Sequence, residues 1–119
     1  MATVTPTLDT DISPHNIIVK WEGFAASADV GTAVEYENLS DRTVQIFGTF
    51  TGSLEMTIEG SLDGGTTWFS LTDPQGNAIV KTAAAGEAIS EAVPLIRPRA
   101  TAGSGGADVD VYIYMKGRR

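Results

Sequence analysis

The sequence predicts an all-β protein, namely an antiparallel β-sandwich or jelly roll of about seven to eight short strands with an extended N-terminal arm. Three observations support this class. Apolar and polar residues alternate along several segments, with the period of a half-buried strand. Thirteen glycines among 119 residues favour many tight turns. No segment has a convincing helical period, so helices are not expected.

A hairpin is the most specific local prediction. The segment SLDGGTTW at 61–68 lies between two alternating stretches, and its Asp-Gly-Gly turn supplies the positive φ angles of a tight hairpin. We expect the Asp63 carboxylate to accept backbone hydrogen bonds and Trp68 to lie under the hairpin as a plug. The pattern resembles the Asp-box of sialidase propellers and other β proteins, a fold element rather than an activity. It comprises Ser61, Asp63, Gly65, Thr67 and Trp68.

The chain length predicts one domain. We assign residues 16–119 to a single β-sandwich domain and residues 1–15 to a flexible N-terminal arm. The arm carries two prolines, several Thr and Asp residues, and no helical or strand period. Terminal segments of this kind are usually mobile unless they are tied down. An arm that becomes ordered only on a partner is the functional alternative.

In the first half of the domain, strands are predicted at 16–24 and 43–50, and a weaker one at 30–36. A further strand at 53–60 has one apolar and one polar face, which implies an antiparallel sheet with one wet side. The apolar face comprises Leu54, Met56 and Ile58, and the polar face comprises Glu55, Thr57 and Glu59.

In the second half, residues 78–82 predict a short strand. Residues 87–96 predict an edge strand or two short pieces, because Pro94 interrupts a ladder. The last strand, at 108–116, follows a glycine-rich loop and alternates cleanly. A slip of one residue would bury two carboxylates, so its register is strongly specified. Its outward residues are Asp108, Asp110, Tyr112, Tyr114 and Lys116.

Composition excludes several classes of function. The net charge of −7 repels phosphate, so direct binding of nucleic acid is not expected. The absence of cysteine excludes a disulfide framework and a thiolate metal site. Neither an export signal nor a membrane span is expected, since the sequence lacks a signal-like start and a long apolar run.

Nothing in the sequence indicates catalysis, so we predict a protein that is not an enzyme, with no catalytic residue, metal or cofactor. A hydrolytic triad needs a histidine beside its nucleophile, and the single histidine, His15, lies in the predicted arm. Most acidic residues alternate with apolar ones on outward strand faces, as in a solvated sheet. The pairs Asp9–Asp11 and Asp108–Asp110 lack the loop of a calcium site.

Two groups of residues suggest contact surfaces instead. Tyr112 and Tyr114 point outward from the last strand, where subunit contact, ordinary half-exposure and sugar binding all remain open. The basic residues gather in the last quarter, as a solvated tail or as a tail that docks on an acidic protein partner. They are Arg97, Arg99, Lys116, Arg118 and Arg119.

The stretch from about Ser53 to Lys116 carries a family resemblance. It combines the strand–Asp-Gly-Gly–Trp hairpin, the Arg-Pro-Arg segment LIRPRATAGSGGAD and a final alternating strand. This succession is similar to small virion proteins of tailed bacteriophages, in particular the capsid decoration or cement proteins with a jelly-roll or β-sandwich fold. The resemblance implies synthesis in the host cytoplasm and attachment to the outer capsid surface, often as homotrimers. It also implies the major capsid protein as partner and stabilisation of the head.

The expected contacts with the capsid or with neighbouring subunits follow from these features. The arm is expected to add a strand to the sheet edge of a neighbour, and the arginines to pair with acidic groups. Two alternatives remain: a carbohydrate-binding or host-adhesion module, and a tail or head–tail connector component. The candidate contact residues are Thr3, Val4, Thr5, Leu8, Ile12, Arg97, Arg99, Tyr112, Tyr114, Arg118 and Arg119.

Overall fold

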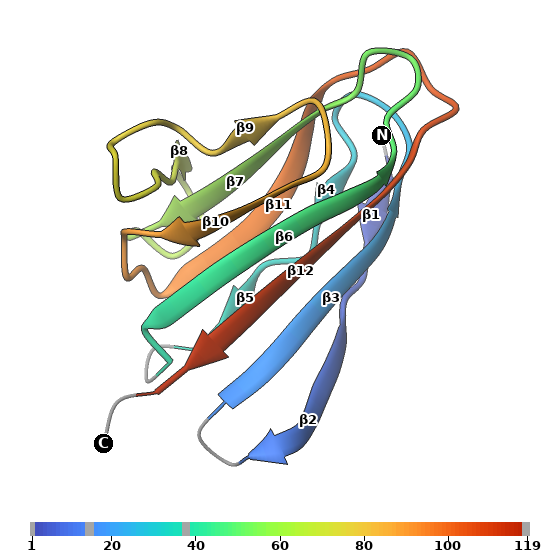
Figure 1. Ribbon diagram of the computed structural model, residues 1–119. Helices are drawn as coiled ribbons and strands as arrows, with labels where there is room; N and C mark the ends of the chain where they lie inside the picture. Colours follow the sequence, from blue (N-terminus) through green and yellow to red (C-terminus); the bar gives the residue numbers. More distant parts are fainter. Residues whose placement is uncertain (1, 14–15, 37–38, 118–119) are drawn as a thin grey trace.

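Strands are the only regular elements in the part of the chain that the computed structural model describes, residues 2–13, 16–36 and 39–117. They form two sheets that pack face to face (Figure 1). Almost every neighbouring pair of strands is antiparallel. The predicted fold class, an all-β antiparallel sandwich, is therefore confirmed.

The five-stranded sheet has the order β10-β6-β12-β3-β2, with all neighbours antiparallel. The last predicted strand, β12, lies at its centre and pairs on both sides. Two predicted strands, at 16–24 and 108–116, have the bounds expected from their alternation. The strands are β2 (Thr7–Ser13), β3 (Asn16–Phe24), β6 (Asp41–Thr49), β10 (Ala85–Ile89) and β12 (Asp108–Lys116).

The seven-stranded sheet has the order β1-β4-β11-β7-β8, with β5 also on β11 and β9 also on β7. Several of its strands have two residues, which explains why the described residues hold more strands than the sequence predicts. The parallel pair is β1 with β4. The strands are β1 (Thr3–Val4), β4 (Val30–Gly31), β5 (Val34–Glu35), β7 (Glu55–Ser61), β8 (Phe69–Ser70), β9 (Val80–Lys81) and β11 (Leu95–Ala102).

The N-terminal segment, which has no strand period in the sequence, contributes one strand to each sheet through β1 and β2. The Val30 N–H donates to the Ala2 carbonyl at 2.9 Å, and the Ala2 N–H donates to the Asp29 carboxylate at 2.9 Å. Val4 is buried in the core. Backbone pairing and one buried side chain do not require apolar and polar residues to alternate. The sequence pattern therefore does not indicate these two strands. The flexibility predicted for residues 1–15 stays a prediction.

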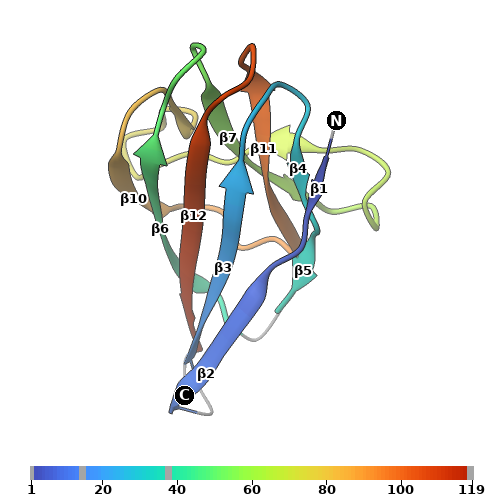
Figure 2. The same cartoon turned by 90° about the vertical axis from the view of Figure 1, so that its right-hand side faces the viewer.

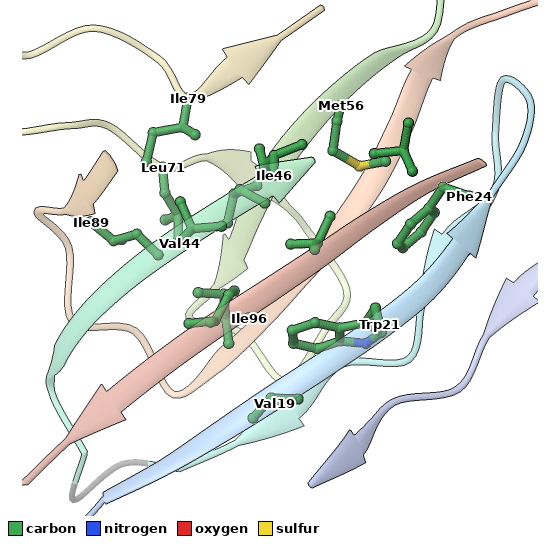
Figure 3. Close-up of a cluster of buried hydrophobic side chains, with 14 of the residues drawn as sticks. Val19, Trp21, Phe24, Val44, Ile46, Met56, Leu71, Ile79, Ile89 and Ile96 are labelled. Atoms are coloured by element: carbon green, nitrogen blue, oxygen red, sulfur yellow. The ribbon is translucent and has the colours of Figure 1, made fainter. Parts of the chain in front are cut away.

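The core lies between the sheets and is built from the inward residues of both (Figure 3). Trp21 and Phe24 of β3 are fully buried, as is Ile96 of β11. The Trp21 indole N–H donates to the Thr32 carbonyl at 2.9 Å, which satisfies the one polar atom of this large side chain. Alternation along β12 places every second residue in the same core, namely Val109, Val111, Ile113 and Met115.

Two prolines mark the start and the middle of β11. The chain ends β10 before Pro94 and begins β11 after it, in agreement with the prediction of two short pieces. Pro98 lies within β11 and is buried. It stands between the points where β11 pairs with β5, at Leu95 and Ile96, and with β4, at Arg99. Pro98, which has no N–H donor, is therefore accommodated at a point where neither β4 nor β5 is paired with β11.

We predict that Gly48→Ala destabilises the fold by more than about 3 kcal/mol. Gly48 has φ +127°, and a Cβ there would lie 2.3 Å from the Asp108 carbonyl oxygen of β12. Gly105→Ala is the matched control, because φ is +113° but no atom lies within 4 Å of the added Cβ. That change should cost about 1–3 kcal/mol from backbone strain alone. Urea denaturation measures both, and equal losses would contradict a role for the close approach of β6 to β12.

Candidate functional site

The predicted contact residues lie on opposite sides of the sandwich. Arg97 and Arg99 are on β11 in the seven-stranded sheet, whereas Tyr112 and Tyr114 are on β12 in the five-stranded sheet. All four alternate with core residues and so point outward. Since the sheets pack face to face (Figure 2), the arginines and the tyrosines form two separate surfaces.

The Asp-box loop is held by a network of short polar contacts. The Ser61 hydroxyl donates to Asp63 Oδ1 at 2.8 Å, and the Thr67 N–H donates to the same oxygen at 2.8 Å. The Gly65 N–H donates to Ser61 Oγ at 3.0 Å. Hydrogen bonds from the Thr67 backbone and the Ser61 hydroxyl lower the pKa of Asp63 below its ordinary value of 3.8. An ionised carboxylate therefore organises the turn.

Trp68 connects this loop to the sheet. Its indole N–H donates to the Gly65 carbonyl at 3.0 Å. Its ring lies against the Arg97 guanidinium, whose central carbon is 3.9 Å from the ring centroid. This cation–π contact anchors the loop to the outer face of β11. The hydrogen-bonded network includes every residue of the predicted Asp-box: Ser61, Asp63, Gly65, Thr67 and Trp68.

A buried carboxylate lies beside the two arginines. The register of β7 and β11 places Glu59 opposite Arg97. The Arg97 Nε atom is 3.0 Å from Glu59 Oε1, and Arg99 Nη1 is 3.5 Å from Glu59 Oε2. Glu59 is 7% exposed and Thr57 is 3% exposed, so the predicted wet face of this strand is wrong. The side chains of β11 and the Asp-box loop cover it, which a single strand's alternation cannot reveal.

These residues line an open hollow of about 460 Å³ on the outer face of the seven-stranded sheet. We call it the β11 hollow. Its two cations differ in access, because the Arg99 side chain is 43% exposed and that of Arg97 is 22% exposed. The hollow thus combines apolar walls, one buried carboxylate and two guanidinium groups. Its lining residues are Ala28, Val30, Glu59, Trp68, Arg97 and Arg99.

The outer face of the five-stranded sheet carries a cluster around Tyr112. This residue lies between Lys20 of β3 and Gln45 of β6. Its hydroxyl donates to Glu22 at 2.5 Å, Lys20 Nζ lies 5.2 Å from its ring centroid, and Phe47 meets it edge-on at 4.9 Å. The hydrogen bond to Glu22 raises the pKa of Tyr112 to about 12. The hydroxyl therefore remains a protonated donor over the physiological range.

Tyr114 continues this surface along β12, between Ile18 and Thr43. It borders a shallow hollow of about 320 Å³ where β6, β10 and the end of β12 meet. We call the outward rings of Phe47, Tyr112 and Tyr114 the aromatic face. All three residues are half-buried, so each side chain packs partly against the protein and leaves part of its surface exposed.

The predicted N-terminal contacts divide into three groups. Thr3 and Thr5 are exposed, whereas the Val4 side chain is in the core and is not a surface contact. Leu8 pairs with Val19, an inward-facing residue, yet it is 48% exposed. The reason is that β2 is the last strand of its sheet (Figure 2). The side chain of Ile12, and all of His15, Arg118 and Arg119, lie outside what the structure describes.

The described residues contain no group of three or more His, Cys, Asp or Glu side chains placed to hold a metal ion. Asp110 instead accepts the Gly23 N–H at 3.1 Å. Burial raises the pKa of Asp110, and the nearby charges of Glu22 and Asp108 raise it further. Within the same described ranges, no helix is long and apolar enough to span a bilayer.

Comparisons with known proteins concern the fold. No protein-family model matches the chain, and no curated protein matches its sequence. The crystal structure of the SPBc2 prophage-derived protein YomS is similar, with a TM-score of 0.59 at 14% identity over 87% of this chain and 96% of that one. At this identity the likeness supports the β-sandwich fold alone.

Two further structures are more distant. PliG of Aeromonas hydrophila, a periplasmic inhibitor of g-type lysozyme, has a TM-score of 0.49 at 13% identity, over 97% of this chain and 96% of its own. A pilus protein of Bacillus endospore appendages has a TM-score of 0.42 at 16% identity, over 97% and 91% respectively. Neither likeness is close enough to support a conclusion.

We predict that Asp63→Asn lowers the free energy of unfolding at pH 7 and that this deficit shrinks in acid. The folded pKa of Asp63 lies below 3.8, so the ionised carboxylate stabilises the loop fully above that pH. The contribution is lost as the pH falls through the folded pKa. Urea denaturation at pH 7 and pH 3 measures it. Thr66→Ala, which keeps the backbone donor, is the control, and a deficit equal at both pH values would contradict the role of charge.

Proposed function

We propose that this protein is a structural component of a phage virion that binds the outside of the capsid and stabilises the head. The observation that carries the proposal is the aromatic face. Phe47 and Tyr112 hold each other edge-on, and the hydrogen bond to Glu22 fixes the Tyr112 ring. Aromatic side chains are enriched at protein interfaces, and rings that are already held in place lose little entropy on binding.

Two likenesses support a phage setting for such a surface. The chain shares its fold with the prophage-derived protein YomS. The hairpin, the Arg-Pro-Arg segment and the final strand follow one another as in phage decoration proteins. A small sandwich with an aromatic contact face suits a shell of repeated subunits, because many weak copies gain by multivalency.

The lateral edge of the sandwich is a second element of the proposal. Leu8 exposes apolar surface on β2, the last strand of the five-stranded sheet. An edge strand can pair with a strand of a neighbouring molecule. We propose that this edge joins copies into the homotrimer, while the aromatic face contacts the major capsid protein. Deleting residues 1–15 is a poor test of either contact, because Val4 belongs to the core.

A sugar-binding function has less support. Stacking on sugar needs a free aromatic face, and the Arg97 guanidinium already covers one face of the Trp68 ring. Trp21 is fully buried. The rings of the aromatic face are half-buried on β6 and β12, and Phe69 on β8 is 39% exposed but stands apart from them in the other sheet.

The test is capsid binding in vitro. Purified capsids without the protein are mixed with wild type, Phe47→Ala or Tyr114→Ala, and binding and capsid heat resistance are measured. Each substitution should weaken binding by about tenfold or more, since aromatic truncations at interface centres are among the costliest.

Phe69→Ala is the matched control. Phe69 is a 39%-exposed phenylalanine on β8 in the other sheet, and its truncation should leave capsid binding unchanged. Wild-type protein that neither binds capsids nor raises their heat resistance would overturn the proposal. An equal effect of the Phe47, Tyr114 and Phe69 substitutions would remove the aromatic face from it.

A further inference from the structure

The β11 hollow has a local charge opposite in sign to that of the whole chain. Its lining contains two arginines and one glutamate, which leaves one positive charge in excess, while the chain carries −7. A surplus of guanidinium on so acidic a protein is not needed for solubility, since net charge of either sign serves that purpose. The excess guanidinium is therefore a candidate for binding an anionic group of a specific partner.

The two arginines have different tasks. Arg97 is committed within the molecule, because its Nε atom pairs with Glu59 at 3.0 Å and its flat face lies on Trp68. The pairing of Arg99 with Glu59 is longer, at 3.5 Å, and involves one nitrogen, Nη1. An arginine has five N–H donors in a planar fork. Arg99, at 43% side-chain exposure, therefore keeps donor capacity for a group from outside.

The wall of the hollow is fixed before any ligand arrives. The Ala28 N–H donates to the Ala100 carbonyl at 2.8 Å. The Asp29 carboxylate accepts the N–H groups of Ala25 and Ala26 at 2.9 and 3.2 Å, and that of Ala2 at 2.9 Å. On the other side the Asp-box network holds Trp68.

We propose that the β11 hollow binds a carboxylate side chain on an acidic segment of a partner protein. Arg99 anchors the carboxylate through paired N–H donors. The apolar surfaces of Val30 and Trp68 receive the residue beside it. Glu59 competes for the same guanidinium, so it limits the affinity. The lining has one positive charge in excess, which a singly charged carboxylate balances and a phosphate dianion exceeds, so an acidic peptide matches the site better than a phosphorylated one.

This inference rests on the proposed function only for the identity of the partner, which would be another protein of the virion. The chemistry of the site can be tested without capsids. The probe is a synthetic peptide of six glutamates followed by leucine amide, added to isotope-labelled protein at low salt. The readout is the NMR signal of the Trp68 indole N–H, with that of the buried Trp21 indole as internal reference.

The expected result is a saturable shift of the Trp68 signal while the Trp21 signal stays in place. Arg99→Glu should weaken binding by about tenfold or more, and Arg99→Lys by a smaller factor, because lysine lacks the planar fork. Glu59→Gln should strengthen binding by about two- to fivefold, since it removes the internal competitor. That gain separates a binding site from a merely structural ion pair.

Lys81→Glu is the matched control. Lys81 is another basic residue of the seven-stranded sheet, and it pairs with Glu87 of β10 in the other sheet at 2.7 Å. Its substitution changes the net charge by the same amount as Arg99→Glu. It should leave binding unchanged. Equal losses from the Arg99→Glu and Lys81→Glu substitutions would overturn the inference, as would a Glu59→Gln variant that binds no tighter.

Binding of inorganic phosphate or of a glucuronate oligosaccharide without binding of the peptide would also overturn it. The two proposals fail separately. A protein that binds the peptide through Arg99 but does not bind capsids would contradict the virion function and leave the hollow's assignment in place. A protein that binds capsids but shows no shift of the Trp68 signal with the peptide would contradict the assignment of the hollow and leave the virion function in place.

Discussion

The structure depends on one constraint: each of two sheets must bury an apolar face against the other. Residues such as Trp21 and Ile96 have no exposed surface, and the burial of large side chains of this kind dominates the free energy of folding. Because side chains alternate along a strand, the choice of inward residues also selects the outward ones. The surfaces available for function are the complement of the core, and so Arg97 and Tyr112 point away from it.

The register between neighbouring strands then decides which outward residues lie side by side and form a site. On β7 and β11 it sets Glu59 beside Arg97, 38 residues apart in the chain, and the Asp-box loop adds Trp68 over the guanidinium. Burying a carboxylate is costly unless it is paired, so the arginines are part of the local stability as well as of the hollow. One side of the sandwich thus joins a structural loop, an ion pair and an accessible cation in a single cluster.

The two outer faces of the sandwich have different chemistry, so in the proposed virion role each face can contact a different protein. The aromatic face carries three half-buried rings, of which that of Tyr112 is held by Phe47 and Glu22. The β11 hollow is small and charged, with Arg99 as its accessible group. A molecule with distinct surfaces on opposite sides can contact a shell through one and another protein through the other, without either contact displacing its neighbour.

The sequence by itself determined the fold class, the bounds of β3 and β12, and the Asp-box turn, because alternation and turn chemistry are local properties of neighbouring residues. Only the tertiary structure decided that Glu59 is buried, that Arg97 stacks on Trp68, and that residues 3–4 and 7–13 join the sheets. Those outcomes depend on register between distant strands and on backbone hydrogen bonds. Neither leaves a pattern in the order of the side chains.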